Sequence, residues 1–434
     1  MIEEDENFDD VGISIIRGRR WDREHSWYKP AHVCRRWRYL ILGSASFLGL
    51  YLVCTPGTPV ADMLANSPPL PLVIDYLDES PNITAEDEEG IFLALEQPNR
   101  IRYVRVGLSF QCLQKFVMAI DHELPILEYL VMVRMTEDQY TTFVFPETIR
   151  APRLRHLVLD SIAPPTGSRL FPTATGLVTL CLFMSDSSNY NPFYDSSTFI
   201  NPNSLLWWIS PLSQLETLEI TTFPNSKVET QLSHTPTITH ATLPNLRSLS
   251  FQGVCAYLEV LIRHIATPRL ERLRVIFFEQ DSYSIPCLVQ FMNTTENKRL
   301  RFDSAKFEFS DDGVRLVTYP HEENRRCSFS MSVDCRRFMG DISNMTEIVD
   351  ALGLVFSAVE HLILDHVEDG QSSETNFYYE VERTQWHELL RPFSNVKDLR
   401  VNHGLVEGFS RYLRLEDGEL PPELLPELQE IFWE

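Results

Sequence analysis

The chain has 434 residues, of which 44% are hydrophobic, enough to bury a large core in two or three compact domains or in one elongated array. Its 61 acidic residues against 38 basic ones give a net charge of −23, which would repel a phosphate backbone. We therefore expect no nucleic-acid partner.

The cysteines and the apolar runs predict the cellular compartment of the protein. The eight cysteines are scattered without a C-x-x-C pair, which indicates reduced, mostly buried thiols of a cytoplasmic or nuclear protein. The acidic start has neither the cationic region nor the apolar core of a secretory signal. The apolar run Leu40 to Cys54 is shorter than the roughly 20 residues of a spanning helix, so we expect no membrane partner.

Residues 1–24 carry an acidic cluster and then a basic one, which is typical of a solvated, disordered terminus. From Trp27 to Val53 the pattern becomes helical, because apolar residues recur at i, i+4, i+7 and i+8, namely Val33, Trp37, Leu40 and Ile41. We predict a small all-α unit at residues 25–55. In so small a unit Trp37 is either a core residue or an interface residue, and the sequence leaves both interpretations open.

Residues 56–85 form a proline-rich connector that ends in the strand-like segment LPLVIDYL, residues 70–77. Residues 86–96 then predict a helix whose acidic first turn suits the positive end of the helix dipole.

Residues 86–434 repeat an apolar anchor of the form Φ-x-x-Φ-x-Φ, often with a proline two residues before it. Helical patterns separate the anchors, whose spacing is near or somewhat above that of leucine-rich repeats. The anchors begin at Ile101, Leu127, Leu154, Leu177, Leu215, Leu246, Leu270, Val359, Val396 and Leu428. Because one strand and one helix cannot bury their apolar face alone, we predict an α/β leucine-rich-repeat-like solenoid of short parallel strands plus helices.

Two features interrupt this pattern. Within residues 303–333, two segments around Phe307 and Met331 alternate like strands, with no clear helix between them. Polar insertions occupy residues 185–203, 224–242 and 365–383, and loops of this length are either functional or simply tolerated.

Strand side chains alternate, so the residues between the anchors should line the concave face of the sheet. A solvated face is the simpler interpretation of any single position, but as a set these residues are our candidate for a client-binding surface. The candidates are Tyr129, His156, Asp160, Glu219, Arg272, Arg274 and Arg400.

Residues 33–38 read V-C-R-R-W-R, which resembles the V-C-R-x-W-R core in the second half of an F-box. Together with residues 52–74 and the irregular repeats, this run resembles the large F-box families of mushroom-forming fungi. The resemblance implies that the helical unit binds a Skp-type adaptor of a cullin-RING ubiquitin ligase and that the repeats collect a protein client. The adaptor contacts that it implies are Val33, Cys34, Trp37, Arg38, Leu40 and Leu50.

The chain departs from the F-box pattern upstream of this core. An F-box normally begins with a Leu-Pro-x-Glu helix, and here only Val11, Ile13, Ile15 and Ile16 could be its remnant. Two functions therefore stay open: a substrate receptor of a ubiquitin ligase, or a non-catalytic interaction scaffold whose F-box has decayed.

An enzyme is the third alternative, and the sequence gives it little support. Phosphate-cradling, dinucleotide-binding, nucleophile-elbow and zinc-helix motifs are all missing. Histidines and cysteines do not cluster at ligand spacing. We therefore predict no catalytic, cofactor-binding or metal-binding residues.

Overall fold

The computed structural model describes sixteen stretches of the chain, and every structural statement below refers to them. They are residues 33–43, 50–77, 83–135, 145–184, 200–222, 240–278, 280, 282–293, 302–310, 313–319, 329–334, 342–366, 383–402, 405–406, 409–410 and 425–433. The chain divides into an N-terminal unit within Asp9–Asn225, with Ala241–Leu243, and a C-terminal unit within Pro244–Glu434, with His240. We describe each unit by itself.

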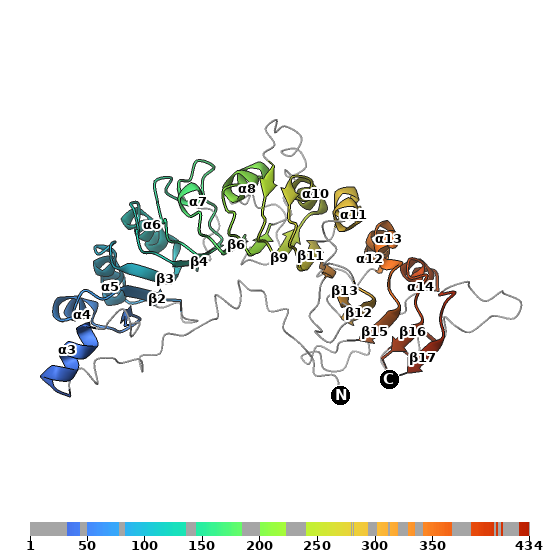
Figure 1. The fold of residues 1–434 in the computed structure, drawn as a ribbon, viewed down its shortest axis with the longest axis horizontal. Coiled ribbons are helices and arrows are strands. Elements are labelled where there is room, and N and C mark those ends of the chain that lie inside the picture. Colours follow the sequence, from blue (N-terminus) through green and yellow to red (C-terminus); the bar gives the residue numbers. More distant parts are fainter. Residues whose placement is uncertain are drawn as a thin grey trace, which may run out of the picture. The chain divides into compact units, whose positions relative to one another are not determined.

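The N-terminal unit is a parallel sheet whose strands follow one another in chain order, with helices on one face (Figure 1). The strands are β1 (Leu52–Cys54), β2 (Leu72–Tyr76), β3 (Ile101–Leu108), β4 (Tyr129–Arg134), β5 (His156–Asp160), β6 (Thr179–Phe183) and β7 (Thr217–Thr221); the short β8 (Ala241–Thr242) follows. The helices are α3 (Arg35–Gly43), α4 (Val60–Asn66), α5 (Ala85–Leu95), α6 (Phe110–Ala119), α7 (Leu170–Thr173) and α8 (Pro202–Ile209).

The predicted anchors hold this unit together. Leu130, Leu157, Leu180 and Leu218 are register partners on adjacent strands, and all four are fully buried. Because each strand places the same anchor position at the same level, the anchors form continuous apolar rows beneath the helices. The predicted α/β class with mostly parallel strands is confirmed.

The start of the sheet differs from the prediction. We expected an all-α unit through residue 55, but helix α3 ends at Gly43 and Leu52–Cys54 is strand β1, paired in parallel with β2. A short apolar run that ends at a turn suits a buried strand better than a helix end, and Gly57 makes that turn with a φ of 72°. The predicted connector likewise contains helix α4 as well as strand β2.

Helix α5, which the sequence predicts at residues 86–96, begins with a capping box. The Asp87 N–H donates to Thr84 Oγ1 (3.1 Å), and the Thr84 N–H donates back to Asp87 Oδ2 (3.2 Å). The Gly57 N–H donates to the other carboxylate oxygen of Asp87 (2.7 Å), which ties the turn after β1 to this helix. Burial acts to raise the pKa of Asp87, but the hydrogen bonds from Gly57 and Thr84 outweigh it and hold the pKa below its usual value of 3.8.

We expect Asp87→Asn to lower the free energy of unfolding by about 1–2 kcal/mol at pH 7, because the N–H groups of Gly57 and Thr84 and the Thr84 hydroxyl (2.7 Å) lose a charged acceptor. A carboxyl with a depressed folded pKa contributes its full stability above the unfolded pKa and loses it as the pH falls through the folded pKa. Urea unfolding at several values between pH 7 and pH 3 should therefore show the gap between variant and wild type closing below about pH 4. A gap that stays constant to pH 3 would contradict this role of Asp87.

The C-terminal unit also consists of mostly parallel strands with helices on one face (Figure 1). In spatial order its strands are β9 (Ser248–Gly253), β11 (Arg272–Phe278), β14 (Phe329–Asp334), β13 (Gly313–Tyr319), β12 (Ser304–Ser310), β15 (His361–His366), β16 (Asp398–Val401) and β17 (Glu430–Trp433); β10 (Ile265–Ala266) is short and separate. Its helices are α10 (Cys255–Arg263), α11 (Pro286–Asn293), α12 (Ile342–Ala351), α13 (Gly353–Phe356) and α14 (Arg383–Leu390).

The stretch without a clear pattern, residues 303–333, is an antiparallel insertion in this sheet. The two predicted strands are present as β12 and β14, and between them lies β13, which pairs antiparallel with both. The strand β13 is not in the sequence prediction, although Val314 and Leu316 alternate with Arg315 at the period of a strand. The outer pairs, β14 with β11 and β12 with β15, remain parallel.

The last anchor is the exception to anchor burial. Leu399 and Val401 on β16 are buried, whereas their register partners Ile431 and Trp433 on β17 are not, and Trp433 is 45% exposed. The expected inward orientation fails here because β17 is the edge strand of the described sheet, with a neighbour on one side only.

Helix α11 begins against a buried carboxylate of helix α10. The N–H groups of Cys287 and Leu288 donate to the two carboxylate oxygens of Glu259, at 2.7 and 2.9 Å. These two donors belong to the first turn of α11 and have no partner within that helix. Glu259 thus joins two successive helices through a cap supplied from outside the capped helix.

We expect Glu259→Ala to lower the free energy of unfolding by about 1–3 kcal/mol, because one buried and one partly buried N–H group lose a charged acceptor. The matched control is Glu271→Ala, which removes an exposed carboxylate paired with Arg247 and should cost less than about 1 kcal/mol. Urea unfolding of both variants measures the difference, and equal effects would refute the capping role.

Several predicted segments lie outside the described residues. These are the terminus at residues 1–24 with Val11, Ile13, Ile15 and Ile16, and most of the three polar insertions.

Candidate interaction surfaces

Helix α3 carries Trp37, Arg38 and Leu40 of the predicted adaptor residues, Val33 and Cys34 directly precede it, and the side chains of all five are exposed. Val33, Trp37 and Leu40 are 68%, 53% and 56% exposed, and Cys34 and Arg38 are exposed as well. Cys34 accepts the first hydrogen bonds of the helix. The Trp37 N–H donates to Cys34 Sγ (3.5 Å), and the Arg38 N–H donates to the Cys34 carbonyl oxygen (3.0 Å). The interpretation of Trp37 as a core residue is therefore wrong. So many large apolar side chains together on a surface are typical of an interaction segment.

The sixth predicted adaptor residue lies apart from the other five. Leu50 is partly buried and lies two residues before the start of strand β1, whereas α3 ends at Gly43. The structure thus brings together the five residues from Val33 to Leu40 in helix α3 and the two residues before it, and leaves Leu50 with the sheet.

A row of aromatic rings crosses the N-terminal unit at the start of its strands. Tyr51, Tyr103, Tyr129 and His156 follow one another with ring centroids 5.6, 6.0 and 5.5 Å apart. Burial raises the pKa of Tyr103 and of Tyr129 to about 12, and burial with the nearby Arg155 lowers the pKa of His156. At neutral pH the rings of Tyr103, Tyr129 and His156 are therefore uncharged. The row brings together two of the predicted client residues, Tyr129 and His156.

An arginine that the sequence analysis did not single out covers the start of this row. The Arg102 guanidinium lies 5.5 Å from the Tyr51 ring centroid and 5.7 Å from that of Tyr103, and its Nε pairs with Glu128 Oε2 at 2.9 Å. In the sequence Arg102 directly precedes Tyr103, so their proximity follows from the chain. The contact with Tyr51 arises only from the fold.

The next row on the same face is buried, although the sequence analysis expects an accessible face there, either solvated or client-binding. Its register partners are Asp75, Arg105, Val131, Val158, Cys181 and Glu219, and all six are buried. Leu77, Tyr129, Met135 and Phe183 pack against the apolar middle of this row. Glu219 is only 3% exposed and so is not on an accessible surface. Its prediction as a client-binding residue is therefore wrong. Asp160, one position further along its strand, is partly buried and accepts a hydrogen bond from Ser161 Oγ (3.1 Å).

The buried row carries charge at both ends. Arg105 Nη1 lies 3.5 Å from Asp75 Oδ2, with both side chains less than 10% exposed. An ion pair with so little water around it depends on both partners, because either charge alone would be buried without compensation.

On the C-terminal sheet three arginines gather on the face turned away from the anchors. Arg272 and Arg274 on β11 alternate with the buried Leu273 and Val275, and both are partly exposed. Arg315 on β13 lies two strands away, where its Nε donates to Ser330 Oγ (3.3 Å) on the intervening β14. We call Arg272, Arg274 and Arg315 the arginine patch. Arg315 is missing from the sequence prediction because strand β13 is.

Beyond the arginine patch the same face becomes a network of paired charges. Lys306 Nζ on β12 contacts Asp365 Oδ2 (2.7 Å) and Glu308 Oε1 (3.1 Å), and Arg315 Nη1 lies 3.5 Å from Glu308 Oε2. Burial alone would lower the pKa of Lys306, but the two carboxylates raise it, so the ammonium stays charged. The predicted client residue Arg400 lies further along this face, with its guanidinium 5.5 Å from the Phe432 ring centroid.

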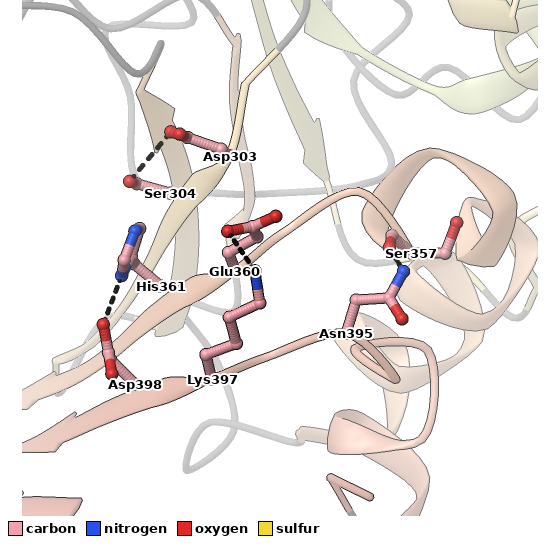
Figure 2. A network of polar contacts seen from close by, with 8 residues as sticks. All are labelled: Asp303, Ser304, Ser357, Glu360, His361, Asn395, Lys397 and Asp398. Carbon is pink, nitrogen blue, oxygen red and sulfur yellow. Dashed lines mark hydrogen bonds and ion pairs between the residues drawn. The ribbon is translucent and has the colours of Figure 1, made fainter. Parts of the chain in front are cut away.

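Cross-strand pairs fix the starts of β15 and β16, as Figure 2 shows. Lys397 Nζ contacts Glu360 Oε2 at 2.8 Å, and His361 Nδ1 contacts Asp398 Oδ2 at 2.7 Å. Asn395 Nδ2 donates to the carbonyl oxygen of Ser357 at 2.6 Å. These contacts hold the register of the two strands.

The same region places a serine, a histidine and an aspartate side by side. Ser304, His361 and Asp398 are register partners on β12, β15 and β16. The Ser304 hydroxyl donates to Asp303 Oδ1 (3.1 Å), and between the described side chains of Ser304 and His361 the structure has no hydrogen bond. A serine nucleophile needs that bond to its base, so this arrangement does not have the geometry of a catalytic triad.

The described residues contain no group of three or more metal-ligating side chains and no helix long and apolar enough to cross a bilayer. Cys54, Cys112, Cys181 and Cys255 are buried, as the sequence analysis predicts for most cysteines. Burial raises the pKa of Cys54 to about 12 and that of Cys112 to about 11, so these two thiols stay protonated. Cys327 and Cys335 lie outside the described residues.

Comparisons of this sequence with models of known protein families and with curated proteins find no match.

Proposed function

We propose that this chain is a substrate receptor of a cullin-RING ubiquitin ligase, in which helix α3 binds a Skp-type adaptor and a sheet face binds a protein client. The observation that carries this proposal is the V-C-R-R-W-R segment at the start of helix α3, because its apolar side chains Val33 and Trp37 are exposed rather than packed. Exposed tryptophan and arginine side chains are the residues most enriched at interface hot spots.

The fold supports the second half of the proposal. Each unit repeats a short strand, an apolar anchor and, in most cases, a helix, which is the plan of a leucine-rich-repeat-like solenoid. Such arrays use their sheet face for binding, and here that face carries the arginine patch. In this proposal the client-binding residues are Arg272, Arg274 and Arg315.

The mechanism is bridging, with no catalytic group and no cofactor on this chain. Holding adaptor and client on one chain turns the encounter between client lysines and the ubiquitin-charged enzyme into an intramolecular event and raises their effective concentration. The buried, protonated thiols suit the reducing conditions of cytoplasm or nucleus, where such ligases work.

A reconstituted ligase tests the proposal without knowledge of the client. The intact chain is incubated with the cullin-RING complex, ubiquitin and its activating and conjugating enzymes, with and without a Skp-type adaptor. A substrate receptor should itself be ubiquitylated only when the adaptor is present. An interaction scaffold with a decayed F-box would remain unmodified in both reactions, and that outcome would remove the ligase assignment.

A further inference from the structure

We propose that strand β17 binds an extended segment of another protein, which adds a strand beside it. The segment that fits has apolar residues alternating with polar ones and carries a lysine or an arginine opposite Glu430. The inference uses neither helix α3 nor the arginine patch, so it goes beyond the proposed function and can fail independently of it.

The outer side of β17 carries backbone groups that can pair with another strand. Among the described strands β17 is the last in spatial order, and β16 is its one neighbour. In a parallel pair, alternate residues of a strand bond to the same neighbour. The Glu430 N–H donates to the Lys397 carbonyl oxygen (3.1 Å), so Glu430 and Phe432 bond to β16. The N–H and C=O groups of Ile431 and Trp433 therefore point away from β16, aligned for an added strand.

The side chains of β17 make both faces of this edge apolar. Trp433 and Phe432 are 45% and 39% exposed, and Ile431 is partly buried. Ile431 and Trp433 are register partners of buried anchor residues on β16, whereas Phe432 lies on the opposite face beside the Arg400 guanidinium. Soluble proteins usually protect an edge strand with lysine, proline or a bulge, and the segment Ile431 to Trp433 has none of these.

The exposed tryptophan is held in place from inside the unit. The Trp433 ring lies 6.4 Å from the ring of Phe409, which is buried and itself lies 5.3 Å from the buried Trp386. Trp433 thus continues a packed aromatic row out to the edge of the strands. Apolar side chains of an added strand would face Ile431 and Trp433 and extend that row by one more strand.

The charge at the start of β17 favours a basic partner. Glu430 is exposed, and so is Glu427 three residues before it. Lys397, just before β16, already contacts Glu360 at 2.8 Å. A lysine or arginine of an added strand can lie directly opposite Glu430, and the net charge of −23 favours the approach of a basic segment.

A second copy of this chain fits the same edge less well. An antiparallel pair that keeps the anchor faces together would place Phe432 opposite Phe432 and Glu430 opposite residue 434, which is also a glutamate. Like charges directly opposite each other destabilise a strand pair, and each copy carries a net charge of −23. Charge therefore favours a basic segment of a different protein.

Fluorescence anisotropy with the full chain, in the absence of adaptor, tests this proposal. The probe is a labelled peptide of the sequence Lys-Val-Thr-Val-Lys-Val-Thr-Val-Lys, whose valines share one face when it is extended. We expect a Kd below about 100 µM. A peptide with Glu in place of Lys should bind at least about tenfold more weakly, because it faces Glu430 with a like charge. A peptide with Pro in place of Thr keeps every charge but should not bind, because proline disrupts strand pairing.

Two charge reversals make the test specific to β17. Glu430→Lys should weaken binding of the lysine peptide about tenfold and make the glutamate peptide the tighter ligand. Glu271→Lys makes the same change of charge just before β11, six strands from β17 in spatial order, and should change binding less than about twofold. Glu430→Lys should keep the thermal unfolding of the wild type, because the side chain is exposed.

A backbone variant tests the pairing itself. Ile431→Pro removes an N–H that points away from β16 and leaves the bonds to β16 in place, so it should weaken binding of the lysine peptide at least about tenfold. The charge reversals decide the proposal even if this variant folds poorly.

Four results would overturn the proposal. They are no binding of the lysine peptide by the intact chain, equal binding of the proline peptide, and equal effects of the two charge reversals. The fourth is a dimer of the chain at about 100 µM in sedimentation that Glu430→Lys dissociates or tightens, which would assign the edge to a second copy.

Discussion

Replacing Arg105 with leucine should lower the free energy of unfolding by about 3–5 kcal/mol, because Asp75 would remain buried without its countercharge. The pair lies on the row of the N-terminal sheet that also holds Val131 and Val158, and both charged side chains are less than 10% exposed. In such a place the desolvation of a lone carboxylate exceeds the value of the pair itself.

Two further variants separate the buried charge from other effects of the substitution. The double variant Asp75→Leu with Arg105→Leu should recover at least about half of the loss, since no lone charge remains. The control Arg102→Leu removes the partner of Glu128 three positions earlier on the same strand, where the side chains are 34% and 25% exposed, and should cost about 1 kcal/mol or less. Urea unfolding measures all three, and equal effects of the two single variants would show that the row is solvated.

Substitution of Trp37 by alanine should weaken adaptor binding by about 2–4 kcal/mol, or roughly 30-fold to 1,000-fold, while leaving the melting temperature unchanged. The binding loss follows from the role of a central tryptophan anchor in a small interface. The unchanged stability follows from the exposure of this side chain, which is 53%.

The matched control is Met118→Ala, which truncates another exposed apolar side chain, 67% exposed, on helix α6. It should alter neither adaptor binding nor stability. Adaptor binding by calorimetry and thermal unfolding by circular dichroism are measured on both variants. A fall of several degrees in the melting temperature of the Trp37 variant, or equal binding losses in both variants, would contradict the assignment of Trp37 to an interface.

The sequence predicts the apolar side of both sheets well. The three-residue anchors such as Leu154, Leu157 and Leu159 are fully buried, because an apolar repeat at strand and helix spacing has only one apolar face to bury. The acidic start of helix α5 is equally clear, because its capping residues are adjacent in the chain.

The opposite face of the N-terminal sheet was harder to predict. Alternation shows that Glu219 faces away from the anchors, but not whether that face is dry. Val131, Val158 and Cys181 at equivalent positions are the signal that could have indicated burial, since strands covered on both sides lose the alternation of apolar and polar residues.

The sequence prediction misses part of the C-terminal strands for a different physical reason. Strand β13 breaks the parallel order through an antiparallel insertion, and its sequence GVRLVTY lacks the anchor spacing on which the prediction depends. The arginine patch could therefore be predicted only in part, as Arg272 and Arg274 without Arg315. Spatial neighbours that come from a change of topology cannot be derived from a repeat period.

The binding of a Skp-type adaptor to the intact chain tests the central claim most directly. Titration calorimetry with the chain at about 50 µM should show one adaptor per chain with a Kd of about 1 µM or lower, which corresponds to about −8 kcal/mol. The Met118→Ala control should match the wild type in this titration. No binding heat at several temperatures, together with no co-elution of chain and adaptor at the same concentration, would contradict the assignment of this protein as a ligase receptor.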